Sequence, residues 1–175
     1  YDHTIVSGTP SFGTSLKMSY DGTKLVVGVP DTNTNEGEAI VYTFNGTNWT
    51  TVPAISLVTT GAGARQGTSA DISDDGTIIV VGAPGSDTNK GRVFTYEYNG
   101  TDWSTIVYTE LVPGSSIGAS LFGSSVSISN PTSGEYRIAV SGPGDDTNQG
   151  AIWTYERNST GVDTYAWVLV EKSIQ

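Results

Sequence analysis

Val27-Gly28-Val29-Pro30 returns in this chain as Val81-Gly82-Ala83-Pro84 and, in altered form, as Val140-Ser141-Gly142-Pro143. In each place a loop containing Asp, Thr and Asn follows the proline. Self-similarity at a nearly constant spacing is the sequence signature of a repeat architecture. The segment therefore indicates three copies of one structural unit.

Other residues recur around this segment in the same order. A glycine opens each copy, in Phe12-Gly13, Gln66-Gly67 and Phe122-Gly123, and these glycines stand 54 and 56 positions apart. We assign residues 12–65 to repeat 1, 66–121 to repeat 2 and 122–175 to repeat 3, within a single repeat domain of residues 1–175.

The first half of each copy predicts two strands joined by a tight turn. Leu16 and Met18 alternate with polar neighbours, which is typical of a half-buried strand. Asp21-Gly22 then supplies a turn, because glycine reaches positive φ without steric cost. The continuous apolar runs at 25–27 and 78–81 favour inner strands that are covered on both faces.

The second half of each copy predicts a hairpin. Residues 40–44 alternate between faces, and Asn45-Gly46 and Asn99-Gly100 are strong short-range hairpin signals. The fourth strand is therefore expected to begin at Trp49 in repeat 1 and at Trp103 in repeat 2.

A single four-stranded sheet of this size cannot bury both of its faces, so such units must pack face to face. A β-propeller is the ring-shaped solution, whereas a β-sandwich would not require a repeated sequence. We predict an all-β fold of three four-stranded antiparallel propeller blades. Propellers usually have about four to eight blades, so we expect the three to belong to a larger or oligomeric ring.

The two ends of the sequence suggest how such a ring closes. Eighteen residues lie between Trp103 and Phe122, and the residues after Trp167 and those before Phe12 together number 19, a match to within one residue. The N-terminal segment 1–11 could therefore supply a strand to the last blade. A segment cut from a longer array at whole periods would give the same match.

These residues resemble the FG-GAP repeats of the integrin-α-like β-propellers. Phe12-Gly13 and Phe122-Gly123 correspond to the FG part, and 27–30 and 81–84 to the GAP part. A glycine also opens the third strand of each copy, as the family pattern requires: Gly37, Gly91 and Gly150. The resemblance implies propeller blades and a non-catalytic role in adhesion or ligand binding.

The family often carries a Ca²⁺ loop between these two parts. Here the corresponding residues, 19–23 and 73–77, are short turns with one or two carboxylates, whereas Ca²⁺ takes about six to eight oxygen ligands. We do not assign a calcium site to these turns. The loops after the prolines hold the remaining metal candidates: Asp31, Asp87, Asp145 and Asp146. Turn capping by Asp and Asn, or contact with glycan hydroxyls, would also explain these loops.

Composition excludes several classes of function. The net charge is −10 with eight basic residues, which disfavours nucleic acid and anionic membranes as partners. The chain has no cysteine, and no apolar run approaches the roughly 20 residues that span a bilayer. His3 is the only histidine, so we expect no His-based catalysis, no enzyme activity and no cofactor other than Ca²⁺.

Four asparagines begin Asn-x-Thr triplets at expected hairpin tips, where they would accept glycans in a eukaryotic secretory route. They are Asn45, Asn48, Asn99 and Asn158. Trp49, Trp103 and Trp167 recur and are expected to pack between blades, whereas Trp153 does not repeat and would suit stacking on a sugar if it were exposed.

We therefore expect an extracellular or cell- or virion-surface module that binds a protein or glycan and associates with itself or with further repeats. The alternative is a structural subunit of an extracellular filament or virion appendage.

Overall fold

The computed structural model describes residues 11–51, 60–101, 103, 108–116, 118–129, 135–159 and 165–174. They form three four-stranded antiparallel sheets, one from each repeat, in which every strand pairs with its neighbour in the sequence. The all-β prediction and the three four-stranded units are confirmed. The segment 1–11, which we expected to supply a strand to the last blade, lies outside the described residues except for Ser11, and His3 lies outside them too.

The first sheet consists of β1 (Ser15–Met18), β2 (Lys24–Val29), β3 (Glu38–Phe44) and β4 (Trp49–Thr51). The second consists of β5 (Ser69–Ile72), β6 (Ile78–Ala83), β7 (Arg92–Glu97) and β8 (Tyr108–Leu111). The third consists of β9 (Ser125–Ser129), β10 (Arg137–Gly142), β11 (Ala151–Ser159) and β12 (Tyr165–Ile174). A helical turn precedes the third strand of each sheet: α1 (Thr32–Asn35), α2 (Ser86–Asn89) and α3 (Asp145–Asn148).

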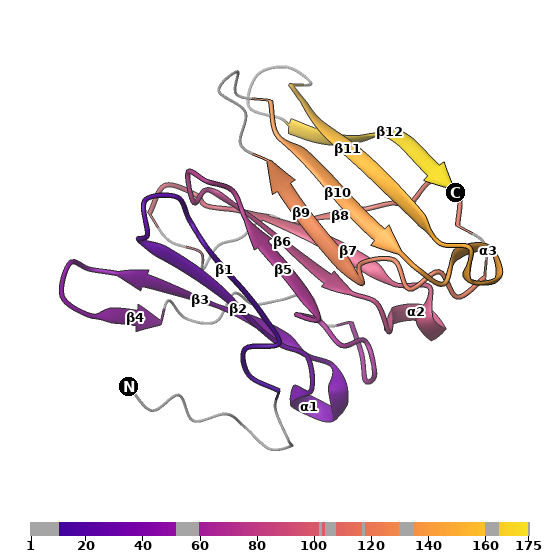
Figure 1. Cartoon of the computed structure of the whole chain (residues 1–175). Helices are drawn as coiled ribbons and strands as arrows, with labels where there is room; N and C mark the ends of the chain where they lie inside the picture. The colour runs from indigo at the N-terminus through magenta and orange to yellow at the C-terminus, as the bar shows by residue number, and fades with distance from the viewer. Residues whose placement is uncertain are drawn as a thin grey trace.

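The three sheets lie side by side in chain order, with the second sheet between the other two (Figure 1). One apolar core lies between the first and second sheets, where Val26 and Val41 meet Ile79 and Phe94. Another lies between the second and third, where Val80 meets Trp153. Burying one such side chain contributes roughly 1.5–3 kcal/mol, so face-to-face stacking is the main source of stability.

The strand registers are equivalent in the three sheets. Ser15 pairs with Gly28, Ser69 with Gly82, and Ser125 with Ser141. Position 141 of the third repeat is therefore a serine where the other two repeats have a glycine. The inner strand β6 is buried along its whole length, which confirms the prediction made from its continuous apolar run.

Two local predictions are wrong. Trp103 lies in a bend, and the fourth strand of repeat 2 is Tyr108–Leu111. The physical reason is that the Trp103 ring is buried in the core between the first two sheets, 5.3 Å from the Tyr98 ring. Asn158 is not at a hairpin tip, because β11 continues through it and it pairs with Ala166.

Within the described ranges, none of the helical turns has the length and apolar character needed to cross a membrane.

Candidate functional site

Each helical turn contains three successive non-glycine residues in the left-handed conformation. In α1 they are Asn33, Thr34 and Asn35, and the corresponding residues 87–89 and 146–148 behave alike, with φ between 46° and 70°. The central threonine of each turn is β-branched, and L-residues of that kind rarely adopt positive φ. From the sequence we expected an ordinary Asp/Asn turn, because a run of left-handed residues has no recognised sequence signal.

Hydrogen bonds within each turn hold this unusual backbone. The amide of the glycine that ends the turn donates to the carbonyl five residues earlier: Gly37 to Thr32 at 3.1 Å, Gly91 to Ser86 at 3.0 Å and Gly150 to Asp145 at 3.0 Å. The same closing bond in all three repeats makes the left-handed turn a constant part of the unit.

Carbonyls at the end of the first two turns accept hydrogen bonds from the start of the next repeat. Asn35 and Glu36 accept the amides of Arg65 and Gln66, both at 2.8 Å. The carbonyls of 89 and 90 accept the amides of 121 and 122 in the same way, at 2.8 and 3.1 Å. These bonds between repeats offset the strain of the left-handed backbone, because each would be lost if the turn relaxed.

The three turns α1, α2 and α3 lie at the same end of the three sheets (Figure 1), and most of their residues are exposed. We call this surface the turn face and define it by its exposed residues: Asn33, Thr34, Asn35, Asp87, Thr88, Asn89, Thr147 and Asn148. Most of these residues present hydroxyl and amide groups, which both donate and accept hydrogen bonds. The hydrogen bond from the glycine that ends each turn fixes the backbone that carries them.

Each of the four metal candidates has a hydrogen-bond or ion-pair partner within the chain. Asp31 accepts Ser11 Oγ at 2.5 Å and lies 3.1 Å from an Arg65 guanidinium nitrogen. Asp87 pairs with Arg92 at 2.9 Å. In the part of the chain that the structure describes, no three Asp, Glu or His side chains gather closely enough to hold an ion.

The other two candidates are neighbours in sequence with different environments. The carboxylate of Asp145 is fully buried and forms an ion pair with Lys172 Nζ at 2.7 Å, while Asp146 accepts Gln149 Nε2 at 3.1 Å. Lys172 also lies 5.3 Å from the Trp153 ring centroid. The Asp145–Lys172 pair therefore joins α3 to β12.

The short turns 19–23 and 73–77 are closed by carboxylate hydrogen bonds. The Ser19 hydroxyl, 2.7 Å away, and then Thr23 lower the pKa of Asp21 to about 2. Burial acts to raise the pKa of Asp75, but hydrogen bonds from Ser73 and Tyr136 outweigh it and the pKa is lowered. Tyr136 belongs to repeat 3, so this bond of 2.5 Å also links two repeats.

Trp103, Trp153 and Trp167 contribute to the apolar cores between the sheets. Trp153 is fully buried and packs edge-to-face on Phe122 at 5.1 Å, so it cannot stack on a sugar. Trp167 packs against the same core, and Trp49 meets Phe44 at 5.3 Å. Packing, the first of the two interpretations made from sequence, is what the structure supports.

Three of the four glycan-acceptor candidates lie in exposed hairpin loops opposite the turn face. The Asn45 side chain accepts the amides of Thr47 and Asn48 at 3.0 and 2.8 Å, and Asn99 accepts the Thr101 amide at 2.8 Å. Asn48 itself is exposed. The side chains of Asn45 and Asn99 therefore already cap their own turns, as Asn commonly does.

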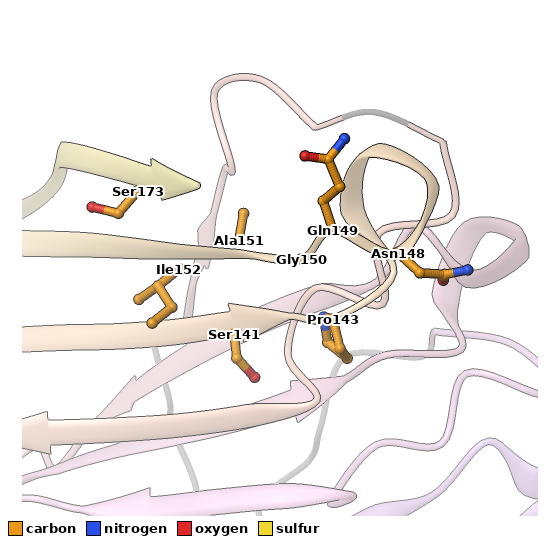
Figure 2. Close-up of a pocket in the computed structure, with 8 residues that line it drawn as sticks. All are labelled: Ser141, Pro143, Asn148, Gln149, Gly150, Ala151, Ile152 and Ser173. Carbon is orange, nitrogen blue, oxygen red and sulfur yellow. The ribbon is translucent and has the colours of Figure 1, made fainter. Parts of the chain in front are cut away.

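A hollow of about 510 Å³ lies beside α3 on the outer side of the third sheet. The end of the α3 turn, Asn148–Gly150, bounds it on one side, and Ser141, Ile152 and Ser173 of the sheet bound it on another (Figure 2). Sequence reasoning did not identify this hollow, because it forms where two segments of the third repeat meet.

A scan of protein-family models finds none that matches the chain, and a search of curated proteins finds no match either. The resemblance to FG-GAP repeats therefore remains a prediction from the residues quoted above.

Proposed function

We propose that this chain is a non-catalytic β-propeller module, extracellular or exposed on a cell or virion surface, that binds a protein or glycan ligand through the turn face. The observation that carries this proposal is the threefold repetition of a left-handed turn whose Thr and Asn side chains are exposed at one end of the sheets. Strained backbone conformations are common at ligand-binding sites, and here they recur in turns that carry exposed polar side chains.

The chemistry of the turn face suits a neutral polar ligand. Hydroxyl and carboxamide groups match the paired donors and acceptors of sugar hydroxyls and of peptide backbone. The acidic groups nearby are paired with Arg65, Arg92 and Lys172. A ligand would therefore meet hydrogen-bonding groups rather than an open field of negative charge.

The stacking of the sheets supports the propeller architecture. The second strand of a sheet packs against the next sheet, since β2 contacts β5 and β6 contacts β9. The first strands of the sheets, β1, β5 and β9, also lie next to one another. Continuing the same face-to-face packing would close a ring of blades.

The turn face can be tested with a variant that removes its three central hydroxyls. Thr34→Ala, Thr88→Ala and Thr147→Ala together leave the backbone at least as tolerant of positive φ, because alanine is not β-branched. Thr47→Ala with Thr101→Ala, in the hairpins at the opposite end, is the matched control.

Immobilised wild-type chain is expected to bind a defined set of glycans on an array, or a surface protein on intact cells. The triple variant should lose most of that binding and the control should keep it. Equal binding by the triple variant would contradict the turn face as the site.

The second candidate function is that of a structural subunit, and one observation favours it. Apolar side chains are exposed on both outer sheets, among them Leu16 and Met18 on the first and Ile152 and Val168 on the third. Electron microscopy that shows ordered polymers of the chain, with no ligand bound on the array, would favour this function.

A further inference from the structure

The two contacts between repeats have the same construction. An opening turn, which includes the residue just before the repeat, stands at the start of each copy: Ser11–Thr14, Arg65–Thr68 and Leu121–Ser124. The amide of the last residue of the turn donates to the carbonyl of the first, at 3.2, 3.2 and 3.1 Å respectively. The second and third opening turns lie against the left-handed turn of the preceding repeat, and parallel bridges join Gly37 to Gln66 and Gly91 to Phe122.

These contacts leave no space for a side chain on the receiving glycines. A Cβ atom at Gly37 would overlap the backbone of Gln66, and one at Gly91 would overlap that of Phe122. At Gly150, the equivalent residue of the third repeat, the nearest atom outside its chain neighbours is 3.5 Å away and belongs to Pro143 of the same repeat. Among the residues that the structure describes, none occupies in repeat 3 the position that receives an opening turn in repeats 1 and 2.

The third left-handed turn is nevertheless formed in full. Residues 146–148 have φ of 46°, 56° and 70°. Among the described residues, no backbone amide donates to the carbonyls of Asn148 and Gln149, the equivalents of the carbonyls that hold the next repeat elsewhere. The hollow of about 510 Å³ lies at this place. The third repeat thus keeps a preformed receiving site, which we call the tail hollow, bounded by Ser141, Gly150 and Ile152.

The first repeat shows the complementary surface. Leu16 and Met18 are 62% and 47% exposed, whereas their equivalents in the third repeat, Val126 and Ile128, are each 9% exposed. Phe12 in the opening turn is 47% exposed, and its equivalent Phe122 is fully buried. We call Phe12, Leu16 and Met18 the head face. Its three apolar side chains are those that the preceding repeat covers elsewhere in the chain.

We propose that the opening turn Ser11–Thr14 of one copy of this chain docks into the tail hollow of a second copy, so that chains associate head to tail. The backbone amides of the incoming turn then reach the carbonyls of Asn148 and Gln149, and the head face covers Ile152. The proposal rests on the propeller architecture proposed above and not on ligand binding at the turn face. The array experiment can therefore fail or succeed independently of this one.

One residue sets the fit of this contact. A Cβ atom at Gly28 or Gly82 would overlap the carbonyl oxygen of the next repeat's Gly67 or Gly123. Ser141 takes the equivalent place in the third repeat, so its side chain keeps the incoming turn farther from the sheet than in the two internal contacts. The contact between chains is therefore looser than the contacts within the chain. We expect Ser141→Gly to lower the dissociation constant of the association by about tenfold, which is the scale of relieving a modest steric overlap.

Charged substitutions on each surface separate head-to-tail docking from other modes of association. Leu16→Asp alters the head face and Ile152→Asp alters the tail hollow, and both side chains are exposed, so the fold of one chain should be kept. Val112→Asp is the matched control, since Val112 is 65% exposed and follows the outer strand of the second sheet. Circular dichroism and thermal melting of each variant confirm that it is folded.

Analytical ultracentrifugation over a concentration series measures association. Wild-type chain and the control are expected to form species of two or more chains, and each single variant is expected to remain monomeric. An equimolar mixture of the two variants should form dimers and nothing larger, because one unaltered head then meets one unaltered tail.

Three results would overturn the proposal. They are a wild-type chain that stays monomeric at every concentration, single variants that associate as wild type does, and a mixture that stays monomeric although wild type associates. An unchanged dissociation constant for Ser141→Gly would overturn the assignment of the incoming turn to this hollow.

Discussion

The carboxylate of Asp71 connects the three sheets, and its removal is expected to weaken the packing of all of them. Asp71 lies in β5 and is only 4% exposed. One oxygen accepts the amide of Ile72 at 2.8 Å, and the other accepts the amide of Ile128 in β9 at 2.9 Å. Lys17 Nζ in β1 lies 3.7 Å from the first oxygen.

The magnitude follows from the buried amides that would lose their acceptor. A buried N–H without a partner costs about 1–3 kcal/mol, and Asp71→Ala leaves two, at Ile72 and Ile128. We expect the free energy of unfolding to fall by about 2–4 kcal/mol, after allowance for partial relaxation. Asp71→Asn keeps one acceptor oxygen and should cost about half as much. The Lys17 ammonium is more than half exposed, so Lys17→Ala should change stability by less than about 1 kcal/mol.

Urea unfolding of wild type and the three variants measures these differences, and amide hydrogen exchange reports the local effect. The Ile128 amide should lose protection in Asp71→Ala beyond the loss expected from global destabilisation. If Asp71→Ala were within about 0.5 kcal/mol of wild type, the scale of ordinary surface substitutions, the carboxylate would not join the sheets and the reasoning would be refuted.

Three further predictions can be checked by unfolding and titration. Gly82→Ala should destabilise the chain by about 1–3 kcal/mol through overlap with the next repeat, while Ser141→Ala at the equivalent position should be nearly neutral in the monomer; equal effects in urea unfolding would contradict this. The Ser19 hydrogen bond lowers the folded pKa of Asp21 from 3.8 to about 2. The stabilisation from the ionised Asp21 carboxylate is therefore complete above pH 3.8 and is lost as the pH falls towards 2. An NMR titration midpoint of Asp21 near 3.8 would count against this hydrogen bond. Burial raises the pKa of Tyr155 above 10.0, so the stability given by its neutral phenol is complete below pH 10 and declines above it; ultraviolet titration should show one tyrosine that ionises only as the chain unfolds.

Much of the fold could be predicted because its signals are local. The inner strand β6 was predictable from four apolar residues in a row, since only a strand covered on both faces accommodates such a run. The turn at Asp21-Gly22 was predictable because an Asp-Gly pair favours a tight turn, in which the glycine adopts positive φ without steric cost. Trp103 was misplaced because the burial of its ring depends on the neighbouring sheet, which the local sequence does not contain.

The candidate site was predictable only in part. The sequence drew attention to the Asp-Thr-Asn loops, but their composition is equally suited to capping, metal binding or glycan contact. In the first two turns the left-handed backbone is accompanied by hydrogen bonds from the start of the next repeat, from Arg65 to Asn35 and from Leu121 to Asn89. Each of these donors lies about 30 positions beyond its acceptor, outside the range of a local sequence pattern. Local propensity disfavours this conformation, so no reading of propensity could have predicted it.

The sequence by itself determined the repeat, its four strands and its tight turns, because the hydrophobic period and glycine positions act within a few residues. Only the tertiary structure decided which surfaces are covered. Phe12 and Phe122 stand in equivalent sequences, yet one is half exposed and the other is buried, because burial is set by whether another repeat lies against the residue. The same reason explains the difference between Gly91, closed against its neighbour, and Gly150, which faces the open hollow.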